Sequence, residues 1–212
     1  IQNSTVPTKP AMRHYSSRGT AITVIVDDTY DATQIRLKPS WSSTWSTYPV
    51  GPPGTTYTFY ADQYGTEYTI AAIGVNAIGD SETRLSNVMT EPRVPSLNDP
   101  VAINNTISVN VSVVGGFDSI RVEMHDQFAE GEIAYRISTS RNFTATFSNL
   151  VPGAIYRFRA ISYKTASYPG NYSPSSGYGG WLPVQNNFAR PENWRWLSAT
   201  NSNCLLYTSD AA

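Results

Sequence analysis

The chain has 212 residues, and at about 100–200 residues per domain this length predicts one or two domains. Its 15 basic and 16 acidic residues give a net charge of −1, so no strong field would draw it to nucleic acid or acidic lipid. No apolar run approaches the roughly 18 residues that a membrane-spanning helix needs. One cysteine and two histidines exclude an internal disulfide and argue against a cysteine- or histidine-based metal centre, so we expect no metal, no cofactor and no catalytic residues.

The two ends of the sequence differ from the rest. Residue 1 is Ile and no signal peptide is visible after it, so we expect an internal fragment of a longer protein. Residues 204–212, CLLYTSDAA, resemble the translation of sequencing-adapter DNA, and we expect this tail to be non-native. The alternative is that residues 204–212 begin a genuine β-strand.

Apolar and polar residues alternate along most of the chain, which predicts half-buried antiparallel strands. Most of the 14 prolines fall between the alternating runs, where they cannot interrupt a hydrogen-bonded ladder. Many short strands separated by turns predict a sandwich or a barrel. The residues that we expect to be buried are Ile22, Val24, Ile35, Leu37, Tyr68, Ile70, Ile107, Val109, Ile120, Val122, Leu150, Tyr156 and Phe158.

The chain repeats itself at a spacing of about 85 residues, because Ile22-Thr23-Val24 recurs as Ile107-Ser108-Val109 and Ile35-Arg36-Leu37 as Ile120-Arg121-Val122. We therefore expect two copies of one domain, joined by a short linker that the prolines at 92 and 95 stiffen. The expected divisions are 1–9 (the end of a preceding module or linker), 10–92 and 93–182 (the two copies), 183–203 (the start of a truncated third module) and 204–212 (the tail).

The run Leu150-Val151-Pro152-Gly153-Ala154-Ile155-Tyr156 resembles the Leu-x-Pro-Gly-x-x-Tyr stretch of the fibronectin type III family, a seven-stranded immunoglobulin-like β-sandwich without a required disulfide. The resemblance implies that Tyr156, and Tyr68 in the first copy, are structural tyrosine-corner residues, and that the Tyr156 hydroxyl is tied to the backbone near Leu150. It also implies an all-β chain of tandem sandwiches. The copies are weakly similar to modules of receptor-type tyrosine phosphatases and tenascins.

Two departures from the family pattern stand out. Val26 and Val111 occupy the places where the family usually has a tryptophan at the end of the second strand. Asp62 and Tyr64 stand where the first copy would have the Leu and Pro of the corner motif. We therefore expect the first tyrosine corner to be packed differently from the second.

Several motifs permit a functional interpretation beside a structural one. Arg18-Gly19-Thr20 and Ile78-Gly79-Asp80-Ser81 are partial matches to an adhesive Arg-Gly-Asp motif, and turns are favoured for both. The carboxylates of Asp27, Asp28 and Asp31 suggest calcium, yet ordinary turn chemistry is favoured. His125-Asp126 resembles half of a catalytic triad but lacks a nucleophile elbow, and Gly115-Gly116 predicts a hairpin turn.

Two sets of polar residues remain as candidate sites. Arg121, Arg136, Arg157 and Arg159 would form a basic strip for an acidic partner if their strands are neighbours, with solvated strand faces as the favoured interpretation. Five Asn-x-Ser/Thr sequons are candidate N-glycosylation sites, at Asn3, Asn104, Asn110, Asn142 and Asn171.

Together, the resemblance and the sequons imply non-catalytic spacer and protein-interaction modules from the extracellular part of a larger cell-surface or matrix protein, with other proteins as partners. Two alternatives stay open. The modules accompany an enzyme whose catalytic domain lies outside this chain, such as a receptor tyrosine phosphatase or a secreted glycoside hydrolase, or they belong to an intracellular, muscle-type structural array.

Overall fold

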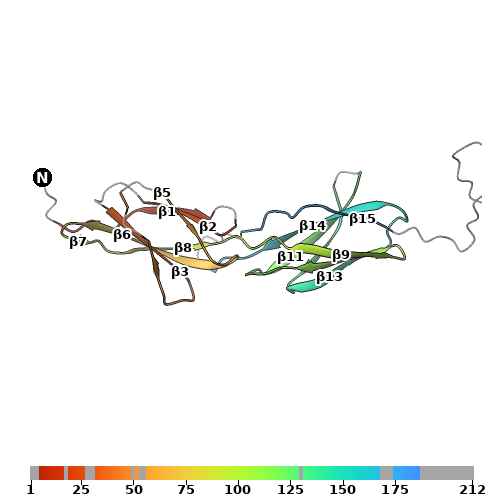
Figure 1. Ribbon diagram of the computed structural model, residues 1–212, viewed down its shortest axis with the longest axis horizontal. Helices are drawn as coiled ribbons and strands as arrows, with labels where there is room; N and C mark the ends of the chain where they lie inside the picture. Colours follow the sequence, from red (N-terminus) through yellow and green to blue (C-terminus); the bar gives the residue numbers. More distant parts are fainter. Residues whose placement is uncertain are drawn as a thin grey trace, which may run out of the picture.

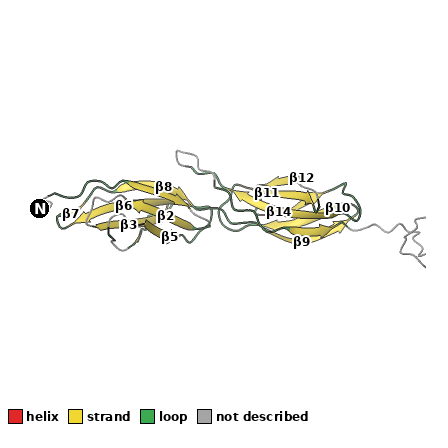
Figure 2. Ribbon diagram, turned by 90° about the horizontal axis from the view of Figure 1, so that it is seen from above, coloured by secondary structure: helices red, strands yellow, loops and turns green. Residues whose placement is uncertain are grey.

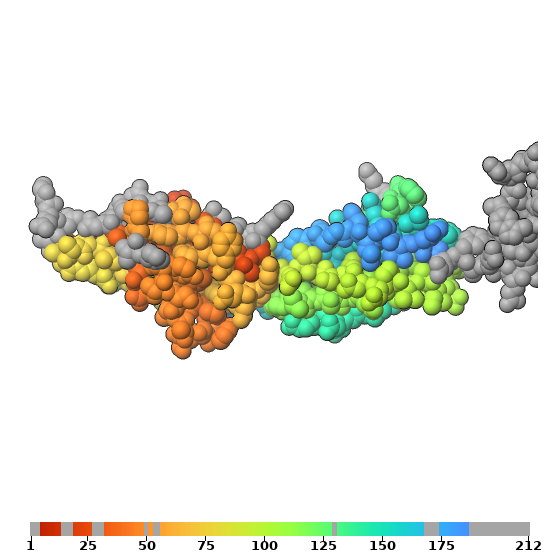
Figure 3. All heavy atoms as spheres, viewed as in Figure 1, coloured from red at the N-terminus to blue at the C-terminus, as the bar shows by residue number. Residues whose placement is uncertain are grey.

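The computed structural model describes residues 5–16, 19–26, 32–48, 51–52, 56–128, 131–167 and 174–186. Every regular element in these ranges is a β-strand, which confirms the expected all-β class. None of the described residues forms a helix that is long and apolar enough to cross a membrane. The elements form two modules that lie end to end along the long axis of the molecule (Figure 1; Figure 3).

The first module is a sandwich of two antiparallel sheets. One sheet has the strand order β1–β2–β5, and in the other β4, β3 and β6 are neighbours while β7 and β8 both pair with β6. The strands are β1 (Met12–Ser16), β2 (Ala21–Val26), β3 (Ala32–Pro39), β4 (Ser46–Thr47), β5 (Thr56–Tyr60), β6 (Glu67–Asn76), β7 (Gly79–Asp80) and β8 (Arg84–Met89).

The second module repeats this arrangement, with one sheet in the order β13–β10–β9 and the other in the order β12–β11–β14–β15. Figure 2 shows the strands of both modules running along the axis of the rod. The strands are β9 (Ser96–Ile103), β10 (Thr106–Ser112), β11 (Ser119–Asp126), β12 (Glu132–Ser138), β13 (Asn142–Phe147), β14 (Ile155–Tyr163) and β15 (Leu182–Gln185).

Each module has its own hydrophobic core, built from the inward side chains of its two sheets. All thirteen residues expected to be buried are buried, and Ile22, Ile107 and Phe158 are completely inaccessible to solvent. Val26 and Val111, the positions where the resemblance would place a tryptophan, are buried in the same cores. Alternation was a reliable guide because in a two-layer sandwich one face of every strand meets the opposing sheet.

Two expectations are corrected by the pairing of the strands. Pro183 does not begin a third module, because β15 pairs with β14 from Ile155–Gln185 to Phe158–Leu182 and completes the second sandwich. Gly115-Gly116 is not a hairpin turn, because β10 and β11 lie in different sheets and the segment between them crosses from one layer to the other. Sequence periodicity identifies strands but not the sheet to which each strand belongs.

The two modules contact each other directly at the junction. The Gly116 N–H donates a hydrogen bond to the Tyr64 carbonyl at 2.9 Å, and on the second module's side the Ser162 hydroxyl fixes the linker by donating to the Arg93 carbonyl at 2.7 Å. Gly65, at φ 58°, lies so close to Gly116 that a Cβ atom on either residue would overlap the backbone of the other. The glycines allow backbone to touch backbone across the junction.

Candidate functional site: an arginine–aromatic face on the second module

The outer face of the β12–β11–β14–β15 sheet carries charged and aromatic side chains that are held in place by one another. Because successive residues of a strand point to opposite faces, Arg121, Glu123 and His125 of β11 share this face with Arg157 and Arg159 of β14. Tyr178 and Trp181, from the segment that leads into β15, lie across it. We call these seven residues the arginine–aromatic face.

Glu123 is the centre of this network and is buried, with 4% of its surface exposed. Its Oε2 accepts a hydrogen bond from Arg159 Nε at 2.9 Å, and its Oε1 accepts from the Tyr178 hydroxyl at 2.8 Å and lies 3.1 Å from Arg121 Nε. Burial alone would raise the pKa of Glu123, but hydrogen bonds from Tyr178, Arg159 and His125 outweigh it and lower the pKa below its ordinary value. Glu123 is therefore held as a carboxylate.

The aromatic rings stack on the guanidinium groups. Trp181 lies between the two arginines of β14, with Arg157 at 4.5 Å and Arg159 at 4.6 Å from its ring centroid. Arg159 also lies 3.8 Å from the centroid of Tyr178, and burial, together with Glu123, raises the pKa of the Tyr178 hydroxyl. These cation–π contacts hold the side chains in place.

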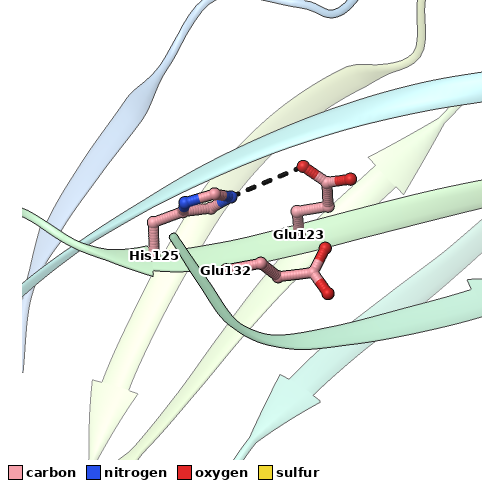
Figure 4. Close-up of side chains that lie close together, drawn as sticks. All are labelled: Glu123, His125 and Glu132. Carbon is pink, nitrogen blue, oxygen red and sulfur yellow. Dashed lines mark hydrogen bonds and ion pairs between the residues drawn. The ribbon is translucent and has the colours of Figure 1, made fainter. Parts of the chain in front are cut away.

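Glu123, His125 and Glu132 bring three potential metal-ligand atoms within 4.8 Å of one another. Figure 4 shows Glu123 and His125 on one side of β11 with Glu132 of β12 beside them, and the dashed line marks the 3.4 Å contact from His125 Nε2 to Glu123 Oε2. The Glu132 carboxylate is bound at both oxygens by Arg121 Nη2, at 2.8 and 2.6 Å. Guanidinium groups thus occupy the carboxylate oxygens that a cation would need, so this cluster is better described as an ion-pair network than as a metal centre.

The predicted basic strip is only partly assembled. Arg121, Arg157 and Arg159 do lie together, but acidic side chains neutralise two of them. Arg136 lies apart from them, since its Nε donates to the Thr146 carbonyl at 2.9 Å and its guanidinium covers the Phe147 ring at 4.7 Å. It therefore bridges the seam between β12 and β13.

The tyrosines expected at the corners are both buried, Tyr68 at 3% and Tyr156 at 4% exposure. The Val151 N–H donates to the Tyr156 hydroxyl at 3.0 Å, one residue beyond Leu150. Burial raises the pKa of Tyr68, opposed by a hydrogen bond from the backbone of Gln63. In both modules the tyrosine hydroxyl thus contacts the backbone that precedes its strand, as expected for a residue that stabilises the fold.

Three of the sequons lie in the described part of the chain, and Asn104, Asn110 and Asn142 are all exposed. Asn110 on β10 is opposite Thr144, and Asn142 on β13 is opposite Ser112, so two sequons face each other across neighbouring strands. The Thr144 hydroxyl donates to Asn110 Oδ1 at 2.9 Å. The sequons at Asn3 and Asn171 lie outside the described residues.

The other motifs have structural surroundings. Gly79–Asp80 forms the short strand β7 beside β6, Gly19 is in a turn at φ 74°, and Asp126 Oδ1 accepts from the Phe128 N–H at 2.8 Å. His125 contacts Glu123 and the edge of Trp181, with ring centroids 4.8 Å apart. The three aspartates considered for calcium, Asp27, Asp28 and Asp31, and the tail 204–212 lie outside the described residues.

Sequence reasoning missed Glu123, Tyr178 and Trp181 as members of this face, and Glu132 as the partner of Arg121 beside it. Arg157-x-Arg159 did signal that two guanidinium groups share one side of a strand. The rings that pack on them come from a segment about twenty residues further on, and no local spacing predicts that contact.

No protein-family model matches the sequence, and no curated protein sequence matches it. Among solved structures, the chain is similar to a two-domain fibronectin type III segment of chicken tenascin, with 17% identity, a TM-score of 0.54, and coverage of 83% of this chain and 98% of that segment. It is also similar to the FN1–FN3 domains of chicken CNTN1, with 12% identity, a TM-score of 0.38, and coverage of 86% of this chain and 68% of that one. The tenascin likeness shows the class of fold: the chain is an all-β tandem array of fibronectin type III sandwiches.

Proposed function

We propose that the chain is a non-catalytic pair of fibronectin type III modules that acts as a spacer and a protein-interaction surface in the extracellular part of a larger cell-surface or matrix protein. The observation that carries this proposal is the direct backbone contact between the modules, the hydrogen bond from the Gly116 N–H to the Tyr64 carbonyl. Two modules joined only by a flexible linker would not make such a contact.

Other contacts at the junction support the same interpretation. Glu67 of the first module accepts hydrogen bonds from the backbone and the hydroxyl of Ser167 in the second. The Arg93 guanidinium lies 5.7 Å from the centroid of the Tyr64 ring. Contacts on several sides of a junction resist bending in several directions, so the pair holds a set distance between whatever lies at its ends.

The arginine–aromatic face supports the interaction role. Tyr, Trp and Arg are the residue types most often found at the energetic centres of protein interfaces. Tyr178 and Trp181 remain 45% and 41% exposed, although their contacts hold them in place. A partner that binds here would meet side chains that are already ordered, which reduces the entropy lost on binding.

A distance measurement between the modules tests the spacer role. Spin labels at L85C and V151C, both on exposed positions, should give a narrow distance distribution in a C204S background. Gly116→Val should broaden it, because the new side chain would overlap the Gly65 backbone. Gly180→Val is the matched control, since a Cβ there meets nothing within 4 Å. A broad distribution before any glycine is changed would contradict the proposal.

A further inference from the structure

Strand β12 is an edge strand with an apolar outer side. Among the described residues it forms a backbone ladder only with β11; at its other edge the Arg136 side chain reaches β13 of the opposite sheet, but no strand is hydrogen-bonded to the β12 backbone there. Three large side chains along it are exposed, Ile133 at 54%, Tyr135 at 48% and Ile137 at 59%. An edge with these properties is a template for pairing with another strand.

Two other edges of the second module carry features that block such pairing. Strand β9 contains Pro100, has Asp99 at φ 48° and shifts its register against β10. Strand β15 has four residues, one of which is Pro183. Strand β12 has seven residues and no proline, and its one register irregularity lies near Ile133, which leaves 134–138 regular.

The backbone of Tyr135 faces the open edge. Its carbonyl accepts a hydrogen bond from Arg136 Nη1 at 2.8 Å, and the same guanidinium reaches the Thr146 carbonyl of β13, beyond that edge. Residues two apart on a strand direct their backbone groups to the same side, so Ile137 shares this orientation. An incoming strand would replace the exposed Arg136 bond with backbone bonds.

We propose that β12 pairs antiparallel with β12 of a second copy of this chain, with Tyr135 at the two-fold axis. Tyr135 is the middle residue of Glu132–Ser138, and with this centre the residues next to the axis, 134–136, belong to the regular part of the strand. Ile133 is then opposite the second copy's Ile137, Ala134 opposite Arg136, and Glu132 opposite Ser138. The register places no two like charges opposite each other and aligns the exposed apolar side chains on one face.

The pairing rests on the proposed interaction role, but the spacer role does not depend on it. Seven residues on each side form an interface at the small end of the known range, below about 1,200 Å². The dimer is therefore weak and forms in a concentration-dependent way. It joins two four-stranded sheets into one and leaves the sequon-bearing outer face of β10 and β13 uncovered.

Sedimentation velocity over roughly micromolar to millimolar protein tests the association. The unmodified chain should shift from monomer to dimer, and Ile137→Lys should weaken the association at least tenfold, because it places a charge beside the apolar stripe. Ile103→Lys is the matched control, since Ile103 is also 59% exposed but lies on β9 of the other sheet. A monomer at all concentrations, or equal effects of the two lysines, would overturn the proposal.

Disulfide trapping tests the register in a C204S background, which removes the chain's single cysteine. Tyr135→Cys should cross-link with itself, because directly opposed residues have Cα atoms about 5.5 Å apart, within disulfide range. Ile137→Cys should not, because its counterpart is displaced by four residues, or about 13 Å. Cross-linking of Ile137→Cys alone, of both variants or of neither would overturn the proposed pairing. Because the distance measurement between the modules is independent of these outcomes, a failed dimer and a failed spacer are distinguishable.

Discussion

Single residues in this chain have well-separated roles, and Tyr156 illustrates a structural one. Its ring lies in the second core beside Leu150, while its hydroxyl accepts the Val151 N–H. The phenol therefore joins the core to the turn that precedes β14. Such a residue contributes both buried apolar area and one hydrogen bond, and the two contributions are separable by mutation.

Tyr156→Phe should lower the free energy of unfolding of the second module by about 1 kcal/mol, the value of one neutral hydrogen bond. Tyr156→Ala should lower it by about 3–5 kcal/mol, because it also opens a cavity. The first module should be unaffected, because the two cores are separate. Denaturant melts of the two-module chain would show one shifted and one unshifted transition. A Tyr156→Ala chain that melts like the unmodified one would disprove the structural role.

Glu123 is a buried carboxylate whose negative charge is needed by its neighbours. Its lowered pKa means that the stability it contributes is present above the unfolded-state pKa, about 4.3 for Glu, and is lost as the pH falls through the folded-state value. Glu123→Gln should lower the free energy of unfolding by about 1–3 kcal/mol at pH 7, because the arginines lose the carboxylate that they contact. This difference in stability between the variant and the unmodified chain should become smaller below pH 4, because Glu123 then begins to lose its charge in the unmodified chain as well. Thermal melts at pH 7 and pH 3 would measure it, and a difference that stays constant would argue against this role for Glu123.

At the scale of elements, β15 shows how a short strand completes a sandwich. It pairs with β14, buries Val184, and is followed by Asn186, whose Nδ2 donates to the Val151 carbonyl at 2.9 Å. The strand therefore secures the same corner that Tyr156 stabilises from inside. Although it has only four residues, β15 covers one edge of β14 and closes the core at Val184.

Two truncations separate β15 from the tail. Removing 204–212 should leave the melting temperature unchanged, as expected for a non-native tail. Removing 182–212 should unfold the second module, because it exposes one edge of β14 and opens the core at Val184. Calorimetry would measure the melting temperatures of both truncated chains and compare them with that of the full chain. Equal stability of the two truncated chains would mean that β15 adds nothing, and a lower melting temperature on removing 204–212 would show that the tail belongs to the fold.

The paired sequons are also a feature of two elements, since Asn110 and Asn142 meet only because β10 and β13 are neighbours. If the chain is extracellular as proposed, expression through the secretory route of a eukaryotic cell should attach glycans to the exposed Asn104, Asn110 and Asn142. Peptide mass spectrometry after enzymatic removal in ¹⁸O-water would identify each site as a labelled aspartate. Asn98, which has no sequon, is the internal control. Three unlabelled sequons would argue against an extracellular setting.

At the scale of the whole molecule, the proposed spacer role depends on the end-to-end arrangement of the modules. The two views at right angles show the modules end to end rather than side by side (Figure 1; Figure 2). The proposed roles therefore fall on different parts of the molecule, the interaction role on the sheet faces and the spacer role on the junction.

The sequence by itself determined the strand class, the two-copy organisation and about half of the residues in the two cores. Val24 and Val109 could be assigned to the interior from alternation alone, because one face of each strand must leave water. Recurrence of that pattern after about 85 residues identified the second module without any knowledge of its contacts.

Only the tertiary structure decided which sheet each strand joins, where the second module ends and what the arginines contact. Pro183 lies in β15 because β14 offers it an open edge, and Trp181 lies between Arg157 and Arg159 because that pairing brings its segment across the sheet. The contact of Gly116 with the first module likewise depends on how two finished sandwiches meet. Periodicity reports which side of a strand is buried, whereas contacts between distant segments arise only when the sheets have assembled.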